Sequence, residues 1–137
     1  MSTVITDKLT GKTAAGNVTI TSEGGSATMQ LQQGVAKAWL YAQQRTATVE
    51  AKNSLNVSSW VDDTTGKSTT NLTNAMSNTY YNILVSNSYD SDATTGNVGC
   101  DEGWPISSSQ LKHNTHYSTA TYYDCDFVYN SIKGDLA

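Results

Sequence analysis

The sequence is poor in charge and has no long apolar run. Only 15% of its 137 residues are charged, and the 12 acidic and 8 basic residues are spread thinly along the chain. Without a basic cluster to neutralise a row of phosphates, nucleic acid is not an expected partner. No apolar run approaches the roughly 20 residues that cross a bilayer, and residues 1–7 lack the charged and apolar regions of a signal peptide. We therefore expect a protein that is made in a cytoplasm, stays soluble and inserts into no membrane.

Cysteine is also scarce. The two cysteines, Cys100 and Cys125, are too few for a disulfide framework, and in a reducing cytoplasm two thiols are expected. Pairing outside a cell stays open. A zinc site built with His113 and His116 is disfavoured, since the cysteines do not form a C-x-x-C pair and the three-residue histidine spacing puts the imidazoles on opposite faces of a strand. We expect no metal and no cofactor.

Motifs for catalysis are missing as well. The chain has no G-x-S-x-G elbow and no glycine-rich phosphate loop. Asp124 and Asp126 would share one face of a strand, and a pair of carboxylates is what glycoside hydrolysis requires. A solvated acidic face is the simpler interpretation. The sequence therefore predicts that the protein is not an enzyme.

Serine, threonine and asparagine are abundant, at 47 of 137 residues. Branched threonine packs well on a pleated surface, and no stretch shows a sustained helical stripe with caps. Short strands separated by Gly, Asn and Asp turns predict an all-β fold, a small antiparallel β-sandwich of jelly-roll-like type. The expected strands are Val35–Ala42, Ala47–Glu50, Leu55–Asp62, Ser68–Leu72, Tyr81–Val85, Gln110–Tyr117 and Thr119–Ile132.

Two of these strands carry specific expectations. Val35–Ala42 is apolar on both faces, which predicts a strand covered on both sides, and in a small domain another subunit can supply the second cover. In Leu55–Asp62, the alternation places Leu55, Val57 and Val61 on the buried side. Asp62 to Lys67 is expected to form a hairpin loop.

The first 33 residues differ in composition from the rest. They hold several glycines among polar residues and only short apolar pieces, so they cannot fill a core of their own. We interpret residues 1–33 as an extended N-terminal docking arm that becomes ordered against a partner chain, and residues 34–137 as the β-sandwich domain. An unstructured terminus is the alternative.

Four motifs, in order, resemble a signature of short bacteriophage virion proteins. Gly34–Trp39 resembles G-x-A-K-A-W and Ser54–Asp62 resembles S-F-N-V-S-S-I-x-D, the two central motifs. Asn71–Tyr80 and Phe127–Asp135 are similar to the later segments. Proteins with this signature are described as tail-fibre or other virion structural proteins of tailed phages, especially those of marine bacteria and cyanobacteria.

The resemblance implies a non-enzymatic virion structural protein, most simply a homotrimeric fibre or appendage subunit anchored to the particle by its N-terminal arm. Expected partners are copies of the chain itself and other virion proteins: capsid, portal or adaptor, or tail. A capsid decoration protein that stabilises the head is one alternative. A module that recognises a host surface glycan is another.

Candidate site residues follow from these expectations. Trp39, Leu40 and Trp60 are predicted to serve packing or inter-subunit contact. The segment 86–103 is predicted to be a long loop, and it ends at Trp104. Tyr89 and Trp104 are the candidate ligand-binding residues, because aromatic side chains on loops can stack on sugars or anchor an interface.

Overall fold

A computed structural model describes residues 5–12, 18–21, 25, 28–45, 48–88, 101–118 and 121–137. The chain divides into two units, residues 1–35 and 36–137. In the first unit, β1 (Thr19–Thr21) and β2 (Thr28–Gln30) form an antiparallel hairpin that is followed by the one-turn helix α1 (Leu31–Gly34). The short helix agrees with the predicted scarcity of helix.

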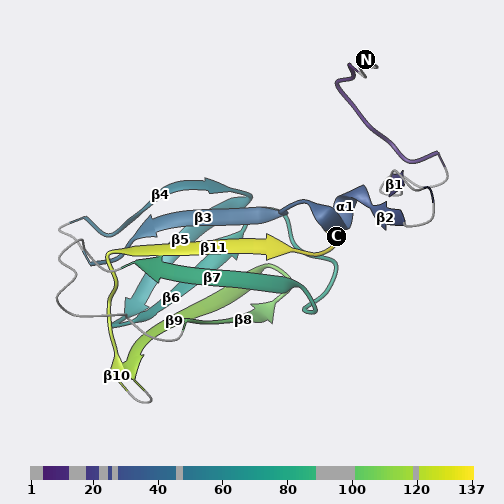
Figure 1. The fold of residues 1–137 in the computed structure, drawn as a ribbon. Helices are drawn as coiled ribbons and strands as arrows, with labels where there is room; N and C mark the ends of the chain where they lie inside the picture. Colours follow the sequence, from purple (N-terminus) through teal and green to yellow (C-terminus); the bar gives the residue numbers. More distant parts are fainter. Residues whose placement is uncertain are drawn as a thin grey trace. The chain divides into compact units, whose positions relative to one another are not determined.

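The second unit is built from antiparallel strands in two sheets, which confirms the predicted all-β sandwich (Figure 1). One sheet has the order β4-β3-β11-β7, and the other has the order β10-β9-β6-β5 with β8 paired to β9. Their bounds are β3 (Ala38–Gln43), β4 (Glu50–Leu55), β5 (Val57–Thr64), β6 (Lys67–Leu72), β7 (Asn82–Ser88), β8 (Asp101–Ser107), β9 (Gln110–Ser118), β10 (Thr121–Tyr122) and β11 (Phe127–Lys133). The first and last long strands, β3 and β11, pair with each other, and β3–β4, β5–β6 and β8–β9 pair as consecutive strands.

The predicted strand Leu55–Asp62 is wrong in two respects. Asn56 has a φ of 56°, so the chain turns there and passes from β4 in one sheet to β5 in the other. An irregularity in the β5–β6 pairing between Val57 and Ser59 then changes which side chains face inward. Val57 and Trp60 pack on the core, whereas Leu55 and Val61 are about half exposed.

Two other predicted boundaries are corrected. The single strand 119–132 is interrupted, because residues 123–126 separate β10 from β11, and residues 119–120 lie outside the described part. The predicted strand Ala47–Glu50 contributes only its last residue to β4, and Ala47 is not described. The hairpin after Asp62 is confirmed, and Gly66 takes a φ of 66° in its turn.

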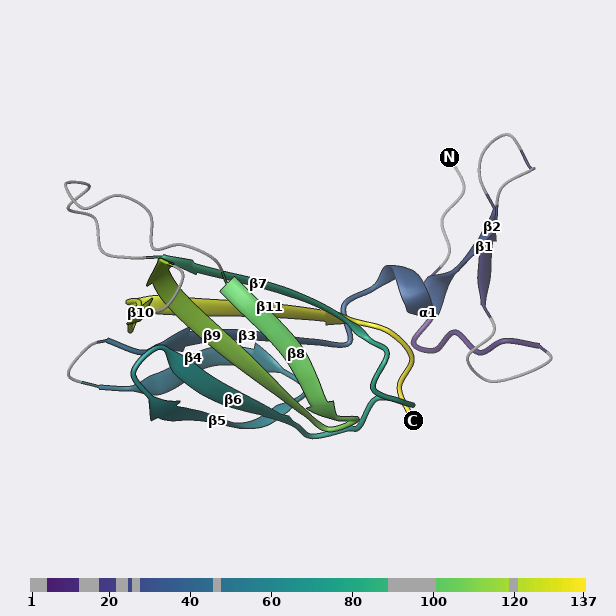
Figure 2. The same ribbon diagram turned by 90° about the horizontal axis from the view of Figure 1, so that it is seen from below.

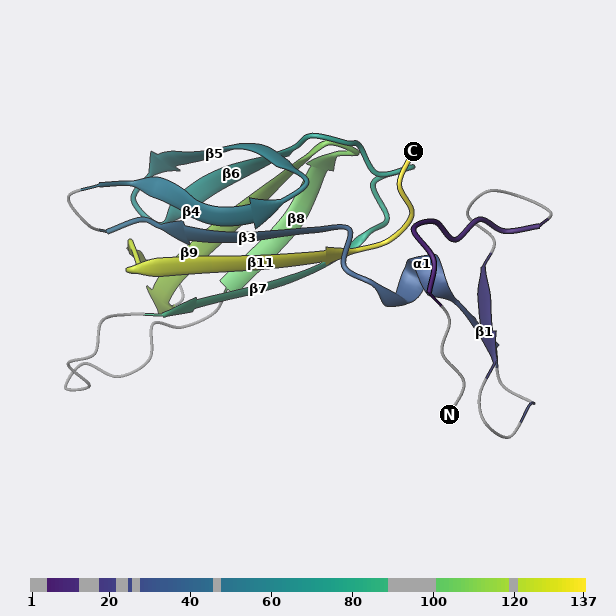
Figure 3. The same ribbon diagram turned by 90° about the horizontal axis from the view of Figure 1, so that it is seen from above.

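At one edge of the sandwich, β7 and β8 pack closely against each other (Figure 2). A Cβ added at Gly103 would lie 2.7 Å from Cγ1 of Val85 and 3.0 Å from Cγ2 of Ile83. Glycine is therefore required in β8 by the approach of the neighbouring sheet. The opposite edge of this sheet is formed by β4 (Figure 3). β4 carries an ion pair between Lys52 and Glu50, and its pairing with β3 is irregular between Tyr41 and Ala42.

The space between the sheets holds two apolar clusters. One contains Ala38, Leu72, Met76, Tyr81, Leu111 and Ile132, and the other contains Leu40, Ala42, Cys125 and Val128. Polar side chains are buried among them, including Thr70, His113 and Asn130. Buried polar groups are tolerated where they find partners. The hydroxyl of Tyr81, for example, reaches the carbonyl oxygens of Ser107 at 2.9 Å and Gln110 at 3.1 Å.

Candidate interaction surface

The outer side of the β4-β3-β11-β7 sheet is unusually apolar. Alternation along β3 and β11 points one set of side chains into the core and the other set outward. The outward set, with its neighbours on β4 and β7, forms what we call the aromatic face: Trp39, Tyr41, Leu55, Leu84, Phe127 and Tyr129. Leu84 is 68% exposed and Leu55 is 49% exposed. The outer side of a sandwich sheet is ordinarily polar, so this face is a candidate for contact with another molecule.

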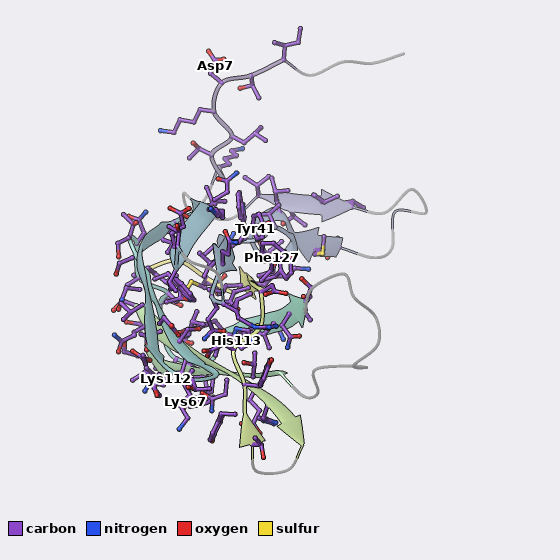
Figure 4. The ribbon with its side chains drawn as sticks, turned by 90° about the vertical axis from the view of Figure 1, so that its left-hand side faces the viewer. Asp7, Tyr41, Lys67, Lys112, His113 and Phe127 are labelled. Carbon is purple, nitrogen blue, oxygen red and sulfur yellow. The ribbon has the colours of Figure 1, made fainter. Side chains whose placement is uncertain are left out.

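The centre of the aromatic face is an ordered group of rings. Tyr41 and Tyr129 are directly paired across β3 and β11, and their rings are stacked with centroids 5.3 Å apart and planes 3° apart. The ring of Phe127 lies 5.4 Å from that of Tyr41 and is tilted by 45°. Figure 4 shows Tyr41 and Phe127 next to each other on this sheet. Such pairs fix the rings, so little side-chain freedom remains to be lost on binding.

A shallow groove of about 210 Å³ runs along the aromatic face between β7 and β11. It is lined by Leu84, Val85, Ser86, Tyr129, Asn130 and Ser131. Ser86 and Ser131 are small outward-facing residues, and they leave a depression between the larger Leu84 and Tyr129. The groove has the size of a site for one large side chain.

Charge is confined to the margins of this surface. Residues paired across β4, β3, β11 and β7 form rows, and one row contains Trp39 while the next contains Tyr41. The other outward-facing side chains in these two rows are uncharged: Asn53, Leu55, Leu84, Ser86, Tyr129 and Ser131. Glu50 and Lys52 lie on the β4 edge, and Lys133 lies at the end of β11. An uncharged centre with a charged rim is the pattern of a protein–protein interface.

The structure separates the three residues predicted for packing or inter-subunit contact. Trp39 lies on the aromatic face and is partly buried there. Leu40 points the other way and is 2% exposed in the core, so its role is packing within one chain. Trp60 also faces the interior and packs against the second apolar cluster, and its buried Nε1 has no hydrogen-bond partner among the described residues.

The two candidate ligand-binding residues are not brought together. Tyr89 lies outside the described residues. The prediction that Trp104 belongs to a loop is wrong, because it lies in the middle of β8, paired with Lys112 of β9. Its side chain is on the outer side of the second sheet and 38% exposed. Of the predicted loop 86–103, residues 86–88 lie in β7 and residues 101–103 lie in β8, and residues 89–100 lie outside the described part of the chain.

The outer side of the second sheet is mostly polar, although Val61 and Trp104 are exposed on it. Gln110 donates to Asn71 at 2.8 Å, Asn71 donates to Ser59 at 2.9 Å, and Thr69 donates to Asp63 at 2.6 Å. Lys112 lies 3.9 Å from the same carboxylate of Asp63. This surface, on which Lys67 and Lys112 are labelled in Figure 4, contrasts with the aromatic face.

The residues weighed for metal binding and catalysis do not assemble a site in the described part of the chain. His113 is buried between the sheets, whereas His116 lies on the outer side, 3.5 Å from Glu102. No group of three or more potential metal ligands is present among the described residues. Asp124 accepts a hydrogen bond from the backbone N–H of Gly66, and Asp126 lies 4.0 Å from Arg45, so the two carboxylates make separate structural contacts.

Five residues of the aromatic face were not among the predicted site residues: Tyr41, Leu55, Leu84, Phe127 and Tyr129. Leu84 lies between the core-facing Ile83 and Val85, and an apolar residue at an outward position of a half-buried strand is a usable signal. The pairing of Tyr129 with Tyr41 had no local signal, because the two residues are 88 positions apart and meet only through the β3–β11 register.

Among the residues that the structure describes, no helix has the length and apolar character needed to span a membrane. No protein-family model, curated protein or solved structure matches the chain.

Proposed function

We propose that the chain is a non-enzymatic structural subunit of a bacteriophage particle and that it works as a homo-oligomer. The observation that carries this proposal is the aromatic face, where six large apolar side chains lie on the outer side of a sheet that needs no further cover to complete its own core. Exposing such a surface in isolation is unfavourable, so a permanent partner is expected. Three copies per assembly is the number that the resemblance to virion proteins implies.

The first unit supports an anchoring role. Its β1–β2 hairpin is only three residues long on each side, and a two-stranded hairpin is marginally stable alone. Several of its apolar side chains are exposed: Ile5, Leu9, Ile20 and Met29. Docking on another virion protein would cover them. In this proposal, the unit of residues 1–35 attaches the subunit to the particle and residues 36–137 form the oligomeric body.

Two positions on the particle fit the same subunit. A fibre or appendage subunit is preferred, and a capsid decoration protein is the alternative. Copy number distinguishes them, because decoration proteins are present in hundreds of copies and appendages in tens. Quantitative mass spectrometry of purified particles, with the major capsid protein as the internal standard, measures this number directly.

A second candidate function rests on Trp104. Its indole is exposed on a polar sheet surface next to Lys112 and close in the fold to the hydrogen-bonded amides of Asn71 and Gln110. An indole beside amide and hydroxyl groups suits the recognition of a sugar ring. A host glycan array tests this candidate, with Trp104→Ala as the matched variant. Equal binding by the two proteins, or binding by neither, excludes it.

Light scattering of the purified full chain tests the main proposal, since the monomer mass is 14.7 kDa. A stable oligomer, together with detection of the protein in purified particles, supports it. Deletion of residues 1–33 is expected to preserve the oligomer and abolish incorporation into particles. A monomer at all concentrations, or a truncated protein that still joins the particle, contradicts the corresponding half of the proposal.

A further inference from the structure

The aromatic face has two halves of different relief. One row of paired residues crosses β4, β3, β11 and β7, and it consists, in that order, of Leu55, Trp39, Ser131 and Leu84. The neighbouring row contains Asn53, Tyr41, Tyr129 and Ser86. Trp39, the largest side chain, lies in the β3 half of the first row, and the small Ser131 lies in the β11 half. The inner position of this row on β3 therefore holds a large side chain, and the inner position on β11 holds a small one beside the groove between Leu84 and Tyr129.

This relief becomes complementary when two copies are related by a rotation axis parallel to the strands. Such an axis sets the β4–β3 half of one copy against the β11–β7 half of the other and keeps the rows in register. Trp39 then faces Ser131, and Leu55 faces Leu84. The hollow opposite Trp39 is the groove of about 210 Å³ between Leu84 and Tyr129. A buried indole in a fitted pocket is the commonest form of an interface hot spot.

We propose that Trp39 of one copy enters the groove between Leu84 and Tyr129 of a neighbouring copy. This inference rests on the proposed homo-oligomer and specifies its interface. The contact joins two different halves of the same face, so it is compatible with a closed ring about a threefold axis and with a twofold pair. In a ring of three, each copy presents Trp39 to one neighbour and receives an indole from the other.

Two properties of the aromatic face favour a second copy over a different partner: its central rows are uncharged, and Trp39 lies in the same row as the groove. The described side chains in the two central rows carry no charge, so copies meet without like-charge repulsion, and no excess of one sign selects a charged partner. The large side chain of Trp39 and the groove also occur along the same row of one sheet. A foreign partner would have to match both halves separately.

Cross-linking with engineered cysteines tests the contact. The variant Leu55→Cys/Leu84→Cys places two thiols on β4 and β7 of the same sheet, three strand spacings apart, which is about 14 Å. That distance is too great for a disulfide within one chain, so any new disulfide joins two copies. Leu55 is about half exposed and Leu84 is more exposed still, so folding should be unaffected. Cys100→Ser is included in every variant, and Cys125 is retained because it is fully buried.

The expected result after mild oxidation is a covalent trimer on a non-reducing gel, while each single-cysteine variant stays monomeric on the gel because position 55 faces position 84 and not itself. A covalent dimer as the largest product supports the contact and replaces the threefold ring by a twofold pair. An oligomer by light scattering that gives no cross-link overturns the contact and leaves the proposed homo-oligomer standing. A wild-type monomer overturns both.

Trp39→Ala gives an independent measurement. Loss of the indole should raise the dissociation constant of the oligomer at least tenfold, measured by dilution in analytical ultracentrifugation. Trp104→Ala, on the outer side of the other sheet, should leave it unchanged. Equal behaviour of the two variants overturns the proposal that Trp39 anchors the contact.

Discussion

The side-chain amide of Asn130 in β11 donates a hydrogen bond of 3.1 Å to the hydroxyl of Thr70 in β6, and both residues are almost completely buried. The two strands belong to different sheets, so this bond crosses the interior of the sandwich. It links polar groups that would otherwise be buried without these partners, and it fixes how the two sheets are placed over each other.

Breaking this link should destabilise the second unit. Asn130→Ala removes a buried hydrogen bond and side-chain volume, and we expect a loss of about 1–3 kcal/mol in the free energy of unfolding. In a double-mutant cycle with Thr70→Val, measured by urea unfolding, the coupling energy should be about 1 kcal/mol. Strictly additive losses would show that the two side chains do not stabilise each other.

The change of sheet at Asn56 gives a graded prediction. Asn56 has a positive φ, its Oδ1 accepts hydrogen bonds from the backbone N–H and the side chain of Asn74, and its Nδ2 donates to the Asn74 carbonyl. Asn56→Gly keeps the backbone conformation but loses these bonds, and should cost about 1 kcal/mol. Asn56→Ala also adds backbone strain and should cost about 1 kcal/mol more. Thermal unfolding should therefore rank wild type above the glycine variant and the alanine variant last; the reverse order of the variants would contradict this account.

Asp62 predicts a dependence of stability on pH. Burial raises the pKa of its carboxyl above the ordinary 3.8, the hydrogen bond from Gln44 opposes this rise, and the nearby Asp124 and Asp63 add to it. The folded protein thus holds this proton more tightly than the unfolded chain, so the ionised carboxylate costs stability at neutral pH. This cost disappears as the pH falls through the raised value towards 3.8.

The matching substitution is Asp62→Asn, which keeps an oxygen that can accept from Gln44. The variant should melt at a higher temperature than wild type at pH 7, and the difference should shrink to nothing near pH 3. Thermal unfolding at a series of pH values measures it. A difference that is constant with pH would mean that the charge of Asp62 is not its cause.

Leu84 and Val61 form a matched pair for the proposed interface. Each is an exposed apolar residue on the outer side of its strand, but Leu84 lies on the aromatic face and Val61 lies on the other sheet. Leu84→Asp should reduce the mass in light scattering to that of the monomer, because an unpaired carboxylate would be buried in the contact. Val61→Asp should leave the mass unchanged. Since surface substitutions usually change stability by about 0.5 kcal/mol or less, both variants should remain folded by circular dichroism. Retention of the oligomer by Leu84→Asp would exclude this face as the interface.

Most of the strands could be predicted from the sequence because alternation and turn residues are local properties. The predicted strand Val35–Ala42 is an example, because β3 contains its residues 38–42 and successive side chains alternate between the two faces. The faces of Leu55–Asp62 could not be predicted, because the turn at Asn56 and the irregularity after Val57 change the phase of the alternation. Asparagine and serine at these positions fit a regular strand equally well.

Trp104 shows a second limit. The segment 86–103 before it was predicted to be a loop, but Gly103 lies in β8, where its missing Cβ makes room for Val85 of the other sheet. A glycine needed for close approach and a glycine needed for a turn look alike in one sequence. The aromatic face likewise depends on the pairing of β3 with β11, which join residues from opposite ends of the second unit.

The edge strand β4 carries the ion pair of Lys52 and Glu50 and pairs irregularly with β3. Both features disfavour edge-to-edge pairing between copies of this chain. A charged, irregular border resists the addition of another chain's strand, which is the step that leads to open-ended growth and aggregation. In the proposed oligomer, β4 would add no strand from another chain, and association would end once the aromatic face of each copy is covered. If the proposed function is correct, the subunit would then accumulate as complexes of fixed size and not as filaments.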